Sequence, residues 1–219
     1  MKLLLFVTKK NKYLVGTLMY GLGYFFYFVT NHYSVWPQHR LPLTWVDEHS
    51  PFLPYSVVIY VSEYYYFAIV FILLNNLDNI SKYFYSFSAL QLISCAFFMF
   101  YPTVYPRENF PISHDLPAWL QETWVWLRTL DTPGNCFPSL HVSSVYLTAF
   151  VLWTDRQKKL FWFFFVWATF IALSTLTTKQ HYLADLLSGF VLSILCYRWF
   201  HFKQEYVRDW EQSFFSISN

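Results

Sequence analysis

The chain of 219 residues is 56% hydrophobic, 24% aromatic and only 13% charged, with a formal net charge of +2. Soluble domains carry about 25% charged residues, so this composition excludes a disordered chain and a nucleic-acid-binding protein. The presence of only three cysteines excludes a disulfide-dense secreted module. The composition favours a polytopic helical membrane protein, provided that the apolar residues are grouped in spans of about 20.

Six apolar stretches have the length of a transmembrane helix. In chain order they are residues 13–30, 55–74, 83–102, 137–154, 160–178 and 182–200. Each is long enough for a hydrocarbon core of about 30 Å at about 1.5 Å per residue. The sequence has none of the alternating segments of about ten residues that a transmembrane β-barrel requires. It therefore predicts an all-α fold, a bundle of six transmembrane helices in which residues 1–219 form a single domain.

The distribution of basic residues predicts the orientation, because Lys and Arg in short loops resist translocation. With a cytoplasmic N-terminus, the inside segments hold eleven Lys and Arg residues, and the outside segments hold four, Arg40, Arg107, Arg128 and Lys179. We therefore expect both termini to be cytoplasmic, and six of the seven histidines then lie on the extracytoplasmic side. The polar stretch 101–136 is expected to be an outside loop with one short interfacial helix around residues 119–128.

An acidic residue marks the start of the last span. Asp185 lies one turn into it, where a charged side chain is costly and usually faces the bundle interior with a partner. His181 precedes Asp185 by four residues, so on a continuous helix the two side chains share one face. The carboxylate can then fix the imidazole tautomer and leave the other ring nitrogen free as a nucleophile. A helix-capping pair without chemistry is an alternative that these two residues alone leave open.

A second histidine opens the fourth span on the same predicted membrane face. Pro138 fits the first turn of a helix, and Ser139 lies near a helix N-terminus, where free backbone N–H groups favour an anion such as phosphate. His141 can protonate the departing oxygen of a phosphate ester as a general acid. The alternative for His141 taken alone is an interfacial histidine without a catalytic role.

These two segments resemble motifs of the type-2 phosphatidic acid phosphatase superfamily. Residues 138–141, Pro-Ser-Leu-His, resemble its Pro-Ser-Gly-His motif, and Ser174, His181 and Asp185 have the spacing of its Ser-Arg-x5-His-x3-Asp motif. The resemblance implies a phosphoryl-transfer enzyme that uses neither a metal nor a cofactor. It also implies that His181 is the nucleophile that forms a phosphohistidine, that Asp185 orients it, and that His141 is the general acid and later the base.

The sequence departs from the family pattern at several positions. Thr175 replaces the arginine that follows the motif serine, and Phe100 and Glu108 replace the lysine and proline of the family's first motif. Leu140 in place of glycine, together with Thr175, is more similar to the inositol phosphorylceramide synthase branch. Members of that branch transfer a head-group phosphate between lipids rather than to water.

Other polar residues are candidates for binding the phosphate or for structural roles. Arg107 and Lys179 are expected to supply positive charge to a substrate phosphate beside Ser139, although Lys179 also fits an interfacial lysine with a snorkelling side chain. Glu63, within the second span, fits either a contact between helices or a substrate role. Asp47 in the first outside loop is expected to be solvated.

The sequence thus predicts an integral membrane protein with an extracytoplasmic active site, and its expected partners are a lipid phosphate substrate and the bilayer. Its leading function is hydrolysis of a lipid phosphate. Transfer of the phosphate to a lipid or sugar hydroxyl remains open, because the same covalent intermediate serves both acceptors. A transporter or a catalytically silent relative also remains open, since two expected cations are replaced and phosphoryl transfer depends on electrostatic stabilisation.

Overall fold

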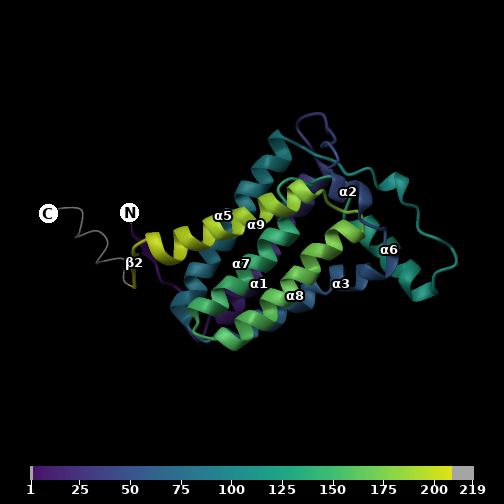
Figure 1. The fold of residues 1–219 in the computed structure, drawn as a ribbon. Helices are drawn as coiled ribbons and strands as arrows, with labels where there is room; N and C mark the ends of the chain where they lie inside the picture. The colour runs from purple at the N-terminus through teal and green to yellow at the C-terminus, as the bar shows by residue number, and fades with distance from the viewer. Residues whose placement is uncertain (1, 209–219) are drawn as a thin grey trace.

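The computed structural model describes residues 2–208 and is built almost entirely of helices (Figure 1). The elements are, in chain order, β1 (Leu3–Leu4), α1 (Lys12–His32), α2 (Trp45–His49), η1 (Pro54–Ser56), α3 (Val57–Val61), α4 (Glu63–Leu73), α5 (Leu77–Phe100), η2 (Arg107–Asn109), α6 (Ala118–Leu130), α7 (Leu140–Thr154), α8 (Lys158–Thr177), α9 (Leu183–Arg198), η3 (Trp199–Lys203) and β2 (Tyr206–Val207). The all-α fold predicted from the sequence is confirmed.

Most of the predicted transmembrane spans correspond to long apolar helices. Within residues 2–208, the five stretches long and apolar enough to cross a membrane are 12–32, 54–73, 77–100, 158–177 and 183–203. The fourth predicted span, residues 137–154, forms α7, which begins at Leu140 and has only 15 residues. Such a helix is about 22 Å long, shorter than a hydrocarbon core of about 30 Å. The protein is therefore a helical membrane bundle with one helix shorter than expected.

The short helix α7 is the centre of the bundle. It packs against α4, α5, α8 and α9, and nearly all of its side chains are buried. The outer helices instead expose large apolar side chains, of which Phe25, Leu92, Phe163 and Val191 are examples. Contiguous apolar surface of this kind is rare in soluble proteins and fits contact with lipid. The central position of α7 explains why it need not span the membrane by itself.

The two ends of the bundle differ. The paired strands β1 and β2 lie at one end, and α2 and α6 lie at the other (Figure 1). Helix α6 forms where the sequence predicts a short helix, and its buried side chains Leu120, Trp124 and Leu127 pack on Val57 and Tyr60 of α3. The start of α7 and the turn between α8 and α9 both lie at this second end, so the two motif segments meet there.

Candidate active site

The turn between α8 and α9 holds His181 against Asp185. The Asp185 Oδ2 atom accepts a hydrogen bond from the Tyr182 backbone N–H at 2.9 Å, as an acidic residue in a first helical turn commonly does, and it lies 3.3 Å from His181 Nδ1. The Cys136 carbonyl lies 3.1 Å from the same nitrogen. His181 precedes the first residue of α9, so the expected pair forms across a helix N-terminus and not along a continuous helix.

These contacts define the state of the His181 ring. Both groups that face Nδ1, a carboxylate and a carbonyl, are hydrogen-bond acceptors, so Nδ1 carries a proton. In the neutral ring Nε2 then has the free lone pair, which is the form needed for a nucleophile. Asp185 is fully buried and His181 is 5% exposed, so little water competes for these contacts.

The second imidazole also has a carboxylate partner. His141 lies in the first turn of α7, where the Ser139 side chain caps the helix by accepting from the Val142 N–H. His141 Nε2 lies 2.9 Å from Glu63 Oε1, and its Nδ1 lies 3.4 Å from the Tyr60 hydroxyl. Glu63 is buried at the start of α4. From the sequence, Glu63 fits either a contact between helices or a substrate role. Its pairing with His141 becomes visible only in the packed structure, because the two residues lie on different helices.

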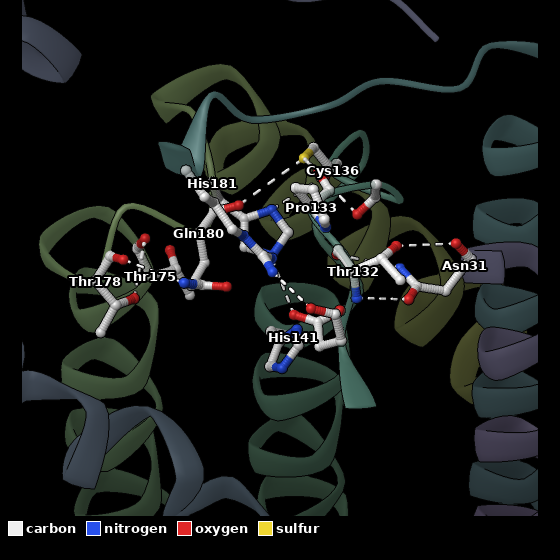
Figure 2. Close-up of polar contacts among 12 residues, drawn as sticks. Asn31, Thr132, Pro133, Cys136, His141, Thr175, Thr178, Gln180 and His181 are labelled. Atoms are coloured by element: carbon white, nitrogen blue, oxygen red, sulfur yellow. Dashed lines mark hydrogen bonds and ion pairs between the residues drawn. The ribbon is translucent and has the colours of Figure 1, made fainter. Parts of the chain in front are cut away.

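The two rings lie close together at the end of the bundle that carries α2 and α6. The ring centroids of His141 and His181 are 5.7 Å apart with an interplanar angle of 61°, and the close-up shows them on adjoining segments (Figure 2). Backbone contacts fix the segments that carry them, because the Ser139 N–H donates to the Asp185 carbonyl at 3.1 Å. A Cβ atom at Gly189 would lie 2.5 Å from the Ser139 carbonyl oxygen, so only glycine permits this approach of α9 to α7.

A family comparison agrees with this geometry. Residues 32–199, about three quarters of the chain, match the family model of the PAP2 superfamily. The chain belongs to the PAP2 superfamily. The match covers both motif segments and supports a phosphoryl-transfer activity of the phosphatase or phosphotransferase type. No curated protein and no solved structure matches the chain.

Among the expected phosphate-binding cations of this PAP2 protein, Arg107 is buried beside the site. Its Nη1 donates to the Asp131 carbonyl at 2.7 Å and its Nη2 donates to Asp131 Oδ2 at 3.0 Å, while Tyr27 donates to Oδ1 of the same carboxylate. Burial by itself lowers the pKa of Arg107, but the Asp131 carboxylate raises it above its ordinary value. The Arg107 Nε atom has no hydrogen-bond partner within residues 2–208 and so retains one donor.

Lys179 is engaged elsewhere. Its ammonium donates to the Asp47 carbonyl and to Ser50 Oγ, each at 2.9 Å, and lies over the ring of Phe110. Asp47 in turn accepts from the Leu183 N–H at 2.7 Å and is 3% exposed. The expectation that Asp47 is solvated is therefore wrong, because its carboxylate caps α2 and binds the start of α9. Lys179 is likewise not a snorkelling residue, since it is buried and ties α2 to the turn that carries His181.

Thr175 and Phe100, which replace the family's arginine and lysine, supply no positive charge. Thr175 is fully buried, donates to the Ala172 carbonyl, and accepts the Gln180 and His181 N–H groups at its own carbonyl. Phe100 is exposed at the end of α5. Gln180, which the sequence did not single out, is fully buried between Thr175 and His181, and its Oε1 has no partner among the residues described (Figure 2).

Cys136 gives the site a possible metal-ligand set. Its Sγ and the ligand atoms of His181 and Asp185 lie within 4.8 Å of one another. Burial and the Asp185 carboxylate raise the pKa of the Cys136 thiol, which favours the protonated form, whereas metals bind the thiolate. The Sγ atom lies 3.3 Å from the Pro133 carbonyl, as expected of a weak thiol donor. In the metal-free protein the cluster thus holds a protonated thiol that faces a carbonyl oxygen, and this thiol would have to lose its proton to bind a metal.

A cavity opens on the other side of His141. It has a volume of about 270 Å³ and is lined by side chains of α1, α4, α5, α6 and α7. Its polar lining includes His141, Glu63 and Asp131 together with Gln91 and Ser144, and apolar and aromatic side chains such as Phe67 and Phe87 supply most of the rest. The acid–base end of the site therefore adjoins a largely apolar chamber.

Proposed function

We propose that the protein hydrolyses a lipid phosphate ester through a phosphohistidine on His181, without a metal ion. The observation that carries this proposal is the pair of buried imidazoles whose centroids lie 5.7 Å apart, each held by its own carboxylate. Covalent phosphoryl transfer needs one nucleophile and one group that gives and then takes a proton. The His181–Asp185 and His141–Glu63 pairs match these two requirements.

In the first step, His181 Nε2 attacks phosphorus while the bond from phosphorus to the alcohol oxygen breaks. Asp185 keeps Nδ1 protonated and stabilises the positive charge that develops on the ring, as the aspartate of a catalytic triad does. The departing alkoxide takes a proton from His141. Since Glu63 engages Nε2 of His141, the proton leaves from Nδ1, and the alcohol departs.

In the second step, water replaces the alcohol. His141 takes a proton from the water as the water oxygen attacks phosphorus, and the bond between phosphorus and His181 Nε2 breaks. Inorganic phosphate is released and both rings return to their starting states. Two sequential displacements through one enzyme-bound phosphoryl group require that the same ring serve first as acid and then as base.

We place the phosphate oxygens between Arg107 and the first turn of α7. The Arg107 guanidinium retains a free Nε donor, and the N–H groups that follow the Ser139 cap lie at the positive end of the helix dipole. Electrostatic stabilisation of this kind is the main contribution of a protein to phosphoryl transfer. Lys179 is proposed to act by fixing the turn that carries His181, because α2 engages its ammonium.

The proposal is tested with purified protein in nanodiscs and a panel of lipid phosphates labelled on phosphorus. We expect release of inorganic phosphate and a transient acid-labile, alkali-stable phosphoprotein. His181→Ala should abolish both, whereas the matched variant His114→Ala, at an exposed loop histidine, should retain both. Turnover that survives in His181→Ala would contradict the phosphohistidine. A wild-type protein that gives neither product would favour a non-catalytic relative or a transporter.

Transfer to a hydroxyl acceptor is the second candidate. It is favoured by Leu140 and Thr175, the two positions that resemble the inositol phosphorylceramide synthase branch. In that reaction a lipid or sugar hydroxyl replaces water in the second step, and His141 takes the proton of the hydroxyl. Incubation with and without candidate acceptors separates the two reactions, because hydrolysis proceeds without an acceptor and transfer does not.

We also propose that both termini are cytoplasmic and that the site faces the opposite, extracytoplasmic side. The excess of basic residues in the inside segments supports this orientation. The three native cysteines are buried, so an introduced cysteine gives a clean signal with a membrane-impermeant maleimide in intact cells. Ser113→Cys should be labelled and Lys159→Cys should not, and the reverse pattern would overturn the orientation.

A further inference from the structure

A buried cysteine next to the nucleophile has no part in the proposed reaction. Cys136 is fully buried in the segment between α6 and α7, and its Sγ atom lies within 4.8 Å of ligand atoms of both His181 and Asp185 (Figure 2). A thiolate, an imidazole and a carboxylate are the side-chain groups that bind zinc in proteins. Cys136 lies far from the other two residues in the chain, so the three ligand atoms meet only in the folded protein.

One carboxylate oxygen of this cluster lacks a partner. Asp185 Oδ2 accepts from the Tyr182 N–H and faces His181 Nδ1, but Oδ1 has no hydrogen-bond partner among residues 2–208. Asp185 is fully buried, so an unpaired oxygen of its carboxylate costs free energy. A buried polar atom of this kind calls for an explanation, and a bound cation fits an oxygen that carries negative charge.

The charges of the three side chains match those of a divalent cation. Once the Cys136 thiol is deprotonated, the thiolate and the Asp185 carboxylate carry two negative charges, and the neutral His181 ring adds none. The nearby Arg107 guanidinium leaves this balance intact, because Asp131 pairs with it at 3.0 Å. A zinc ion at the cluster would therefore give a buried site without net charge, which avoids the cost of burying an unpaired ion.

The spacing of the ligand atoms is close to that of a zinc site. In a tetrahedral site, bonds of about 2.0–2.3 Å to zinc place the ligand atoms about 3.3–3.8 Å apart. The three atoms lie within 4.8 Å of one another, so a shift of about 1 Å completes the set. The segment that carries Cys136 is held in place, because the Phe137 N–H donates to Thr103 Oγ1 at 2.9 Å. A set of sulfur, nitrogen and oxygen suits zinc better than Mg²⁺ or Ca²⁺, which prefer oxygen alone.

We propose that Cys136 Sγ, His181 Nδ1 and an oxygen of Asp185 form an inhibitory zinc site. The thiol gives its proton to water as the metal binds. His181 binds through Nδ1, the ring nitrogen that faces Asp185, and the proton that Nδ1 carried moves to Nε2. The ring stays neutral, but Nε2 then has no lone pair with which to attack phosphorus. Zinc thus holds the nucleophile in its inactive tautomer.

The inhibition rests on the proposed function, whereas the binding of zinc does not. The reaction uses no metal, so the site acts only when zinc in the surrounding fluid is abundant enough to displace the thiol proton. Removal of zinc returns the proton to Nδ1 and frees the lone pair of Nε2. The site is therefore a reversible brake on the nucleophile.

The first experiment measures binding without turnover. Protein in nanodiscs, treated with EDTA and then desalted, is titrated with Cd²⁺, whose bond to a thiolate gives an ultraviolet charge-transfer band. We expect the band to saturate at a single equivalent of Cd²⁺. Cys136→Ser should lose it, since a hydroxyl is a poor metal ligand but keeps the hydrogen bond to the Pro133 carbonyl. Cys196→Ser, at a buried cysteine of α9, is the matched control and should keep the band.

Two results of this titration would overturn the site. The first is the absence of a charge-transfer band in wild-type protein. The second is a band of equal strength in wild-type protein and in Cys136→Ser, because the thiolate would then come from another cysteine.

The second experiment measures inhibition. Zn²⁺ should stop release of phosphate from a lipid phosphate by wild-type protein, and EDTA should restore it. Half-inhibition of Cys136→Ser should require more than about tenfold more Zn²⁺, since loss of even an outer-shell partner weakens metal binding about 10–100-fold. Cys196→Ser should be inhibited like wild-type protein. Equal inhibition of wild-type protein and Cys136→Ser would overturn the inhibitory role, and so would activity that requires added zinc.

The two experiments separate failure of this inference from failure of the proposed function. Protein that releases no phosphate but shows the Cys136-dependent band would refute the hydrolysis and support the metal site. Protein that hydrolyses the lipid without such a band would support the hydrolysis and refute the metal site.

Discussion

The site contains two pairs of a histidine and a carboxylate, and they are built in different ways. His181 and Asp185 are four residues apart and belong to one turn, and their contact forms at the N-terminus of α9. His141 and Glu63 come from different helices, and their contact forms only when α4 packs on α7. Asp185 engages Nδ1 of its ring, whereas Glu63 engages Nε2 of the other.

The ring nitrogen that each carboxylate contacts explains how two imidazoles can take different catalytic roles. A carboxylate on Nδ1 leaves Nε2 free, the nitrogen farther from the backbone and better placed to attack phosphorus. A carboxylate on Nε2 stabilises the protonated ring, which is the form that a general acid requires. Which nitrogen the carboxylate holds thus decides which nitrogen remains for chemistry, Nε2 in the proposed nucleophile and Nδ1 in the proposed acid.

Asp185→Asn should cause the largest loss of activity. This variant tests the His181–Asp185 pair, whose two residues belong to one turn. Asparagine keeps an acceptor for Nδ1 but removes the negative charge that stabilises the developing imidazolium, so we expect kcat to fall by about 10²–10³. The fold should survive, since asparagine can still accept from the Tyr182 N–H. Asp115→Asn, at an exposed loop aspartate, is the matched control. A loss of less than tenfold in phosphate release would show that Asp185 is only a helix cap.

A third buried pair, Arg107–Asp131, contains no histidine. We expect its loss to lower the free energy of unfolding of the protein, in contrast to the two histidine pairs, whose loss is expected to lower activity. Asp131→Ala leaves the Arg107 guanidinium buried without its carboxylate, and breaking a buried ion pair costs about 3–5 kcal/mol. We expect a clear drop in Tm, measured by thermal unfolding in detergent, with Asp115→Ala as the control. An unchanged Tm would mean that water or lipid compensates the charge.

Glu63→Gln tests the long-range pair and should have a smaller effect than Asp185→Asn. Glutamine can still contact His141 Nε2, but it no longer stabilises the protonated ring, so we expect kcat to fall by about 10–100-fold with KM nearly unchanged. The loss should shrink with an aryl phosphate, whose leaving group needs no proton. Glu122→Gln on α6 is the control. Equal losses on alkyl and aryl substrates would contradict a role through His141.

Metal removal should have the smallest effect. We expect activity after dialysis against EDTA to stay within about twofold, because the two pairs provide a nucleophile and an acid without a Lewis acid. Cys136→Ala should likewise keep most of the activity, since its thiol lies against carbonyl groups. Loss of activity with EDTA together with rescue by zinc would instead assign Cys136, His181 and Asp185 to a metal site.

The parts of the molecule that depend on local sequence were predictable. The apolar spans predicted the positions of the long helices. The spacing of His181 and Asp185 predicted their contact. Both predictions depend only on residues that are close together in the chain. The true length of α7 was not predictable from hydropathy. The first residues of the predicted span, Phe137 to Ser139, are apolar or small but form the loop that brings Ser139 against Asp185.

Contacts between distant segments were not predictable. An acidic residue in an apolar span signalled that Glu63 has a partner, but 77 residues separate it from His141 in the chain. The same limit explains Asp47 and Lys179, whose charges looked solvent-exposed or interfacial and are in fact buried against the turn before α9.

The contact at Gly189 has a mechanical consequence. Main chain meets main chain there, and the hydrogen bond from Ser139 to Asp185 joins the same two helices beside it. Although α9 also exposes apolar side chains such as Val191, its first turns are held against α7 by this contact. We therefore expect the spacing of the two imidazoles to change little when the surrounding bilayer bends or thins.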